Sequence, residues 1–203
     1  YSLMLKAHKE SGAACTIACM PVPIEEASRF GVLNTNPDGS IYEFEEKPKK
    51  PKSNLASMGI YIFTAEKLFE YLQLDEDNPE SSKDFGKDIL PAMLHAGEKM
   101  MSYQFTGYWK DVGTIASLWE ANMDLLGEDP KFDVSDDTWK IHSRNPLAPP
   151  EYIGDDAKIS DSMIALGCEI HGKVEHSVLA SNVVIEKGAY VKDAVIMAGT
   201  VVK

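Results

Sequence analysis

The chain contains little cysteine and no long apolar run, and each shortage excludes a class of protein. Its three cysteines, Cys15, Cys19 and Cys168, are odd in number and lack the spacing of a metal site. We therefore expect reduced thiols in a cytoplasmic protein rather than a disulfide framework. No apolar run approaches the roughly 20 residues that a membrane-spanning helix needs, and no signal-peptide pattern is present. We expect no membrane partner.

Basic residues are also in deficit. Lysine and arginine together number 20 against 32 aspartates and glutamates, which gives a net charge of −12. Non-specific binding to nucleic acid or to anionic membranes requires an excess of positive charge, so we expect neither partner. Any recognition of phosphate must use a few local basic residues. The hydrophobic content of 44% and the charged content of 26% are those of an ordinary globular protein.

Residues 1–130 alternate between patterns typical of short buried strands and of amphipathic helices. This alternation predicts an α/β sheet domain. The helical pattern begins directly after Tyr1, where an initiator methionine is missing, so we expect a fragment of a longer chain. Strands are expected at residues 14–20, 30–34, 41–45, 56–63 and 100–105, and helices at 2–9, 65–72, 85–95 and 115–126.

From residue 152 onward the pattern changes, and aliphatic residues recur mostly every five or six positions. Neither a helix nor simple hairpins fit this period, whereas a β-helix of hexapeptide repeats does. The sequence thus predicts a proline-containing linker at 131–151 and a β-helix at 152–203, whose open end we expect to stack on or be capped by another element. The inward-facing positions are expected to be Ile153, Ile159, Ile164, Ile170, Val174, Leu179, Ile185, Val191, Ile196 and Val202.

The stretch from Gly107 to Thr114 places one carboxylate, Asp111, between an aromatic pair and a glycine turn. Thr114 can cap a helix over the apolar positions that follow, and Gly127 can close it. We expect this helix to pack on a core and to hold Asp111 rigidly. A rigid carboxylate suits Mg²⁺, which prefers oxygen ligands. Such a site needs a second ligand, however, and a lone aspartate in a turn is more often structural.

Glu46 and Lys47 follow the strand expected at 41–45, and Pro48 forces the chain to leave the sheet there. Ligands of α/β sheets bind at such strand ends. Lys47 can hold a phosphate as a point charge, and Glu46 can accept hydrogen bonds from sugar hydroxyls. A solvated loop is the alternative, because further lysines follow.

Other polar residues have both a functional and a structural interpretation. Ser57 and Tyr61 flank Gly59 within an expected strand, where a glycine permits close approach of a ligand or of another backbone. Asp84 is well placed to bind a sugar hydroxyl, but the start of a helix also needs a capping residue there.

Two histidines, His171 and His176, lie in the expected β-helix. Hexapeptide acyltransferases use a histidine as a base between coils. Nothing near these residues indicates a site for an acyl carrier, so a surface or stacking role is favoured.

Taken together, the motifs closely resemble those of the bacterial glucose-1-phosphate adenylyltransferase (ADP-glucose pyrophosphorylase) family. Each motif is weak alone, but their order, followed by a β-helix pattern, is specific. The resemblance implies the C-terminal portion of a Rossmann-like nucleotide-diphospho-sugar transferase domain and then a left-handed parallel β-helix. The motifs are residues 27–32 (ASRFGV), 44–48 (FEEKP), 56–61 (ASMGIY), 84–88 (DFGKD) and 107–114 (GYWKDVGT).

The family reaction is the conversion of ATP and glucose 1-phosphate to ADP-glucose and pyrophosphate, the committed step toward glycogen. The resemblance implies that Lys47 grips the sugar phosphate and that Asp111 is one of two carboxylate ligands of Mg²⁺, which makes these two the catalytic candidates. It further implies that Glu46, Ser57, Tyr61 and Asp84 shape the glucose pocket, that the Gly31 backbone lies alongside, and that Phe85 and Trp109 form its walls.

The family's glycine-rich nucleotide loop and its other metal-binding aspartate would precede Tyr1. We therefore expect this chain alone to be inactive, with at most weak affinity for the sugar phosphate. The full-length parent is expected to form a homo- or hetero-tetramer through the β-helix and to be under allosteric control. Alternatives are a non-catalytic regulatory subunit, a nucleotidyltransferase for another sugar, such as a mannose 1-phosphate guanylyltransferase, and, last, a hexapeptide acyltransferase.

Overall fold

A computed structural model describes residues 1–135, 137, 142–143 and 146–203, which form two compact units, residues 1–107 and 108–203. The linker expected at 131–151 includes positions outside the described residues, so the expected domain boundaries stay predictions. The first unit contains α1 (Ser2–Ser11), β1 (Cys15–Pro21), α2 (Ile24–Ala27), β2 (Gly31–Thr35), β3 (Ile41–Glu46), β4 (Leu55–Phe63), α3 (Ala65–Glu76), the π-helix η1 (Phe85–Ile89), α4 (Leu90–His95) and β5 (Met100–Gln104).

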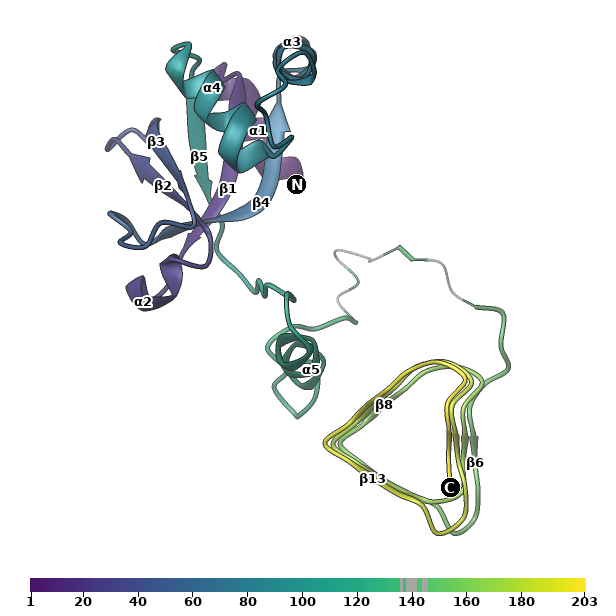
Figure 1. Ribbon diagram of the computed structural model, residues 1–203. Helices are drawn as coiled ribbons and strands as arrows, with labels where there is room; N and C mark the ends of the chain where they lie inside the picture. The colour runs from purple at the N-terminus through teal and green to yellow at the C-terminus, as the bar shows by residue number, and fades with distance from the viewer. Residues whose placement is uncertain (136, 138–141, 144–145) are drawn as a thin grey trace. The chain divides into compact units, whose positions relative to one another are not determined.

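The strands of the first unit form one mixed sheet in the order β3-β2-β4-β1-β5 (Figure 1). β1 pairs parallel with β5 and antiparallel with β4, and β2 pairs antiparallel with both β3 and β4. The strand β1, which lies between β4 and β5, is buried on both faces, because its alternate residues meet helices on opposite sides. Ile17 packs in the cluster that contains residues of α3 and α4, while Thr16 Oγ1 lies 2.8 Å from His8 Nδ1 of α1.

The sequence predicted every helix and strand of the first unit except the short α2. One of the predicted helices is partly a π-helix rather than an α-helix. The helix expected at 85–95 begins as the π-helix η1 and becomes α-helical only at Leu90. Pro91 follows at once and has no N–H to donate to the carbonyl four residues earlier, so the regular hydrogen-bond ladder is interrupted there. The wider turn places Gly86 against the end of β3.

The second unit begins with α5 (Ile115–Met123) and continues into a parallel β-helix with triangular coils (Figure 1). Every aliphatic position predicted to face inward lies on one of its strands, and equivalent positions stack, as Ile153, Ile170, Ile185 and Val202 do. Its sides are β6 (Tyr152–Ile153), β9 (Glu169–Ile170), β12 (Val184–Ile185) and β15 (Val201–Val202); β7 (Lys158–Ser160), β10 (Lys173–Glu175) and β13 (Tyr190–Lys192); and β8 (Met163–Ile164), β11 (Val178–Leu179) and β14 (Val195–Ile196).

α5 is shorter than the helix expected at 115–126, and the expected packing of this helix on a core stays a prediction. The helix ends at Met123, no residue of α5 is buried, and Ile115 is 89% exposed. Within its unit the helix is attached by polar contacts. The Trp119 indole N–H donates to the Asp193 carbonyl over 2.8 Å, and the Gly127 N–H donates to Asp161 Oδ1 over 2.8 Å. No helix in the described ranges is long and apolar enough to span a membrane.

The cysteines of β1 are predicted to be unreactive in the folded protein. Burial raises the pKa of the Cys15 thiol to about 12 and that of Cys19 to about 11. Because the thiolate is the nucleophile, a disulfide reagent near pH 8 should label them on the order of 10³-fold more slowly than free cysteine. A Cys168→Ser variant isolates these two thiols, and the same variant in urea is the positive control. Rapid labelling of the folded variant would show that β1 opens to solvent.

Candidate functional site

Most of the predicted site residues belong to the first unit and lie on neighbouring elements. They come from the start of β2, the end of β3, the middle of β4 and the start of η1. The remaining two, Trp109 and Asp111, belong to the second unit, and each group is described within its own unit. The residues of the first unit are Gly31, Glu46, Lys47, Ser57, Tyr61, Asp84 and Phe85.

The carboxylate of Glu46 lies against two glycines. Gly31 is paired with Glu46 across the β2–β3 ladder, and a Cβ on Gly31 would collide with the ring of Phe44 and lie 3.1 Å from Glu46 Oε2. On the other side, a Cβ on Gly86 would lie 2.6 Å from the same oxygen. A side chain at Gly31 would displace the Phe44 ring, and one at Gly86 would displace the Glu46 carboxylate, so both glycines limit where this carboxylate can be.

A bulge in β4 brings Ser57 and Tyr61 to the site. Between the pairs Ile17↔Tyr61 and Cys19↔Ser57 the strand β4 contains extra residues, and Gly59 at its centre has a φ of 67°. The bulge is closed locally, because the Gly59 N–H donates to Ser57 Oγ over 3.2 Å. The sequence suggested that Gly59 allows close approach of a ligand or of another backbone. In the structure Gly59 has a left-handed backbone conformation within the bulge, which residues with a side chain disfavour.

Tyr61 lies in the electrostatic field of both carboxylates of the site. Burial raises the pKa of its phenol, a hydrogen bond with Ser57 opposes this, and the negative charges of Glu46 and Asp84 raise the pKa further. The phenol is thus a neutral hydrogen-bond donor at physiological pH. Its ring stacks on Phe85, with centroids 5.8 Å apart and planes inclined by 21°. Tyr61 is therefore in contact with the apolar ring of Phe85 and is influenced by the charges of Glu46 and Asp84.

Asp84 caps η1, as the structural interpretation of the sequence predicted. Its Oδ1 accepts a hydrogen bond from the Lys87 N–H over 2.9 Å. Asp88 completes a reciprocal arrangement, since its Oδ2 accepts from the Asp84 N–H over 3.0 Å and from the Ser82 hydroxyl over 2.6 Å. The side chain and the backbone N–H of Asp84 are thus both hydrogen-bonded. Sequence reasoning did not single out Asp88, although it lies inside a quoted motif.

Lys47 continues the chain beyond Glu46 with an unusual backbone conformation. Its φ is 48°, and its N–H donates to the Phe30 carbonyl over 3.1 Å. The ammonium lies 3.6 Å from Glu46 Oε1, and 66% of the side chain is exposed. Exposed ion pairs of this kind are weak, so the ammonium can move to an incoming anion at little cost.

In the second unit, the residues around Asp111 connect their segment to α5. The Tyr108 hydroxyl donates to Asp124 Oδ2 over 3.0 Å, and the Lys110 ammonium lies 2.8 Å from Glu120 Oε2. Thr114 caps α5 as predicted, in a capping box with Ser117. Asp111 itself is exposed, and its carboxylate lies over Gly113, where a Cβ would be 3.3 Å from Oδ2.

The fit of Asp111 to Mg²⁺ follows from its chemistry. The described residues contain no group of at least three acidic, histidine or cysteine side chains able to hold a metal ion together. An exposed carboxylate such as Asp111 still suits Mg²⁺, which often takes one or two carboxylates and completes its shell with water and substrate phosphates.

The histidines of the β-helix are both engaged by neighbouring side chains. His171 packs on the Tyr152 ring with centroids 5.7 Å apart. His176 lies at a corner of the coil, where its Nδ1 is 2.7 Å from Asp193 Oδ1. These contacts agree with the stacking role favoured by the sequence.

Comparison with known proteins matches both parts of the chain to families. A family model for nucleotidyl transferases matches residues 1–128, and one for the GlmU-like C-terminal hexapeptide matches residues 151–203. The second match confirms the expected left-handed parallel β-helix.

Three similar curated proteins share the same name. A glucose-1-phosphate adenylyltransferase of Clostridium perfringens is 58% identical over 200 residues, which cover 98% of this chain and 52% of the relative. A protein of that name from Clostridium botulinum is 57% identical over 195 residues, covering 96% and 50%. Another from Bacillus cereus is 55% identical over 199 residues, covering 98% and 53%. The chain thus spans about half the length of the curated relatives it matches.

Substitution of Gly86 by alanine is predicted to displace the Glu46 carboxylate. The new methyl group would lie 2.6 Å from Glu46 Oε2, so the carboxylate must move. We expect a changed ¹³C shift of the Glu46 carboxyl and a loss of about 1–3 kcal/mol in the free energy of unfolding. Gly12→Ala is the control, because its methyl group meets nothing within 4 Å and only its φ of 62° is unfavourable. An unmoved Glu46 signal in Gly86→Ala would contradict this packing.

Proposed function

This chain belongs to the nucleotidyl transferase family, and on that premise we propose that it supplies the sugar-phosphate half of a glucose-1-phosphate adenylyltransferase. The enzyme would convert ATP and glucose 1-phosphate to ADP-glucose and pyrophosphate, a step toward glycogen. The observations that support the proposal are the approach of Gly31 and Gly86 to the Glu46 carboxylate, the stacking of Tyr61 on Phe85, and the influence of Ser57, Glu46 and Asp84 on the Tyr61 phenol. The shared name of relatives 55–58% identical to the chain supports the choice of glucose 1-phosphate and of an adenylyl group.

Recognition of glucose would use carboxylates against an aromatic face. Glu46 and Asp84 accept hydrogen bonds from sugar hydroxyls, and charged acceptors form the stronger bonds. Ser57 and the neutral Tyr61 phenol can donate as well as accept. Phe85 covers the apolar side of the pyranose, and we propose Trp109 as a second wall. Few polar groups and an apolar wall are typical of small-molecule sites.

The sugar phosphate would be held by Lys47, whose exposed ammonium can reach an anion. In the reaction a phosphate oxygen of glucose 1-phosphate attacks the α-phosphorus of ATP, and the bond to the β-phosphate oxygen breaks to release pyrophosphate. The attacking oxygen is already ionised, so this chain need not remove a proton. Its residues contribute mainly alignment of the nucleophile, which can lower a barrier considerably.

We propose Asp111 as a ligand of Mg²⁺, with Lys47 the other catalytic residue. When bound, Mg²⁺ would neutralise charge on the phosphates of ATP. We also propose that the β-helix mediates assembly into a homo- or hetero-tetramer, since hexapeptide β-helices often mediate oligomerisation. The protein would act in the cytoplasm.

A titration of the 203-residue chain with glucose 1-phosphate tests the sugar site. We expect amide shifts centred on Glu46, Ser57, Tyr61 and Asp84, with a Kd of about 1 mM or weaker. Inorganic phosphate should shift only residues around Lys47. Tighter binding of mannose 1-phosphate would favour a transferase for another sugar. If no sugar phosphate shifts these residues, the assignment of the site is wrong.

Two substitutions in an active full-length protein containing this chain test the assigned roles. Lys47→Ala should raise the KM for glucose 1-phosphate by roughly 10- to 100-fold, because one charge-assisted contact is lost, and should change kcat little. Asp111→Asn should lower kcat by about 10²-fold or more, because a ligand of the metal is weakened. Lys50→Ala, in the exposed loop after Lys47, is the control. An unchanged KM in Lys47→Ala would contradict the phosphate assignment.

A further inference from the structure

Two lysines of the first unit have backbone conformations that side chains disfavour. Among its described residues other than glycine, only Lys47 and Lys83 have a positive φ, of 48° and 61°. A left-handed conformation costs a residue with a Cβ about 1–2 kcal/mol, and such residues concentrate at functional sites. Each lysine is the immediate neighbour of a carboxylate of the sugar site, since Lys47 follows Glu46 and Lys83 precedes Asp84.

The Lys83 side chain binds the C-terminal end of α3. Its ammonium donates to the carbonyl oxygens of Asp75, Glu76 (3.0 Å) and Asn78 (3.4 Å). The last carbonyls of a helix lack partners within the helix and carry partial negative charge, so a cation there is favourable. The ammonium is also 4.0 Å from Asp75 Oδ2. These contacts explain how the unfavourable φ of Lys83 is maintained.

The loop between α3 and η1 is attached at the same point by Ser81. Its hydroxyl donates to Asp75 Oδ1 over 2.5 Å and accepts from the Lys83 N–H over 2.9 Å. Lys83 is therefore fixed through both its backbone and its side chain. The next residue along the chain is Asp84, so the contacts of Lys83 with the end of α3 also restrict the position of the Asp84 backbone.

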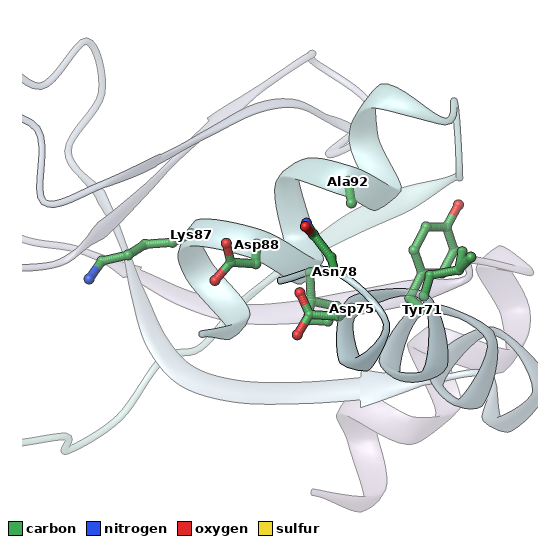
Figure 2. Close-up of a pocket in the computed structure, with 8 residues that line it drawn as sticks. Tyr71, Asp75, Asn78, Lys87, Asp88 and Ala92 are labelled. Carbon is green, nitrogen blue, oxygen red and sulfur yellow. The ribbon is translucent and has the colours of Figure 1, made fainter. Parts of the chain in front are cut away.

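An open pocket of about 340 Å³ lies beside this attachment, between α3 and the helical segment η1–α4. Figure 2 shows Asp75, Asn78 and Asp88 around this space, with Tyr71 and Ala92 at its side. Loss of the Lys83 contacts would leave room for the loop to shift.

We infer that Lys83 is a positioning residue that aims Asp84 at the sugar by binding the C-terminal carbonyls of α3. The inference rests on the proposed function, because it takes Asp84 as a sugar ligand. Lys83 does not itself touch the sugar. Its left-handed backbone sets the direction in which the chain enters η1, and its ammonium holds that direction.

The first test is independent of any ligand and measures amide hydrogen exchange in the 203-residue chain. In Lys83→Ala, the amides of Asp84 and Lys87, which are bonded to Asp88 and to Asp84, should exchange at least about 10-fold faster. The amides of β1 should be unchanged. Lys6→Ala, which removes an exposed lysine from the Lys6–Glu10 ion pair of α1, should alter neither set. Unchanged exchange at Asp84 and Lys87, or equal acceleration throughout the unit, would overturn the inference.

The second test measures the Kd of glucose 1-phosphate for three variants. Lys83→Ala should weaken binding by about 5- to 20-fold, and Lys83→Arg should recover most of it, because the cation at the helix end is kept. Lys83→Gly permits the same φ without the ammonium, so it should bind as poorly as Lys83→Ala. Recovery in Lys83→Gly would show that only the backbone conformation matters and would overturn the role of the ammonium. If the unsubstituted chain binds no glucose 1-phosphate, the proposed function fails, while the exchange experiment still decides the position of Asp84.

Discussion

The approach of Glu46 to two glycine backbones is the constraint on which the rest of the first unit's site depends. Phe44 and Glu46 lie at the end of β3, and the chain of Gly31 runs beside them in β2. η1 contacts the same carboxylate through Gly86. No side chain can be added at either contact without moving Phe44 or Glu46. The positions of three separate segments are thus coupled through one carboxylate, and Asp84 and Phe85 are placed as a consequence.

The β-helix depends on a different constraint, because each position of a coil favours the same type of residue in every coil. Aliphatic residues fill the interior because identical positions stack from coil to coil. Asp161, His176 and Asp193 occupy equivalent corners, each one residue after a strand, and all have a positive φ between 42° and 48°. Aspartate and histidine tolerate this conformation better than most residues. The same corners bind the segment around α5, so the repeat supplies an attachment point as well as a core.

The sequence predicted features that depend on local pattern, and it failed where a contact between distant residues decides. The interior positions of the β-helix, the β2–β3 hairpin and the Thr114 cap could be read from spacing and turn residues alone. The contact that the π-helix makes could not, because it joins Gly86 to Glu46, 40 positions earlier in the chain. The end of α5 was also missed, because the helix stops at Met123 although the apolar spacing continues to Leu126. The strained φ of Lys83 leaves no mark in the sequence at all.

The charges of the proposed site give the substrate an orientation. The negative charges of Glu46 and Asp84 both act on the Tyr61 phenol, while the exposed cation Lys47 follows Glu46 in the chain. A phosphate placed among the carboxylates would be repelled, so the hydroxyl-bearing end of the sugar is favoured there and the phosphate is favoured beside Lys47. The net charge of −12 repels phosphate from most of the chain. A single lysine can therefore bind the sugar phosphate only if it lies close to the sugar pocket. Lys47 meets this condition, because its ammonium lies 3.6 Å from the Glu46 carboxylate.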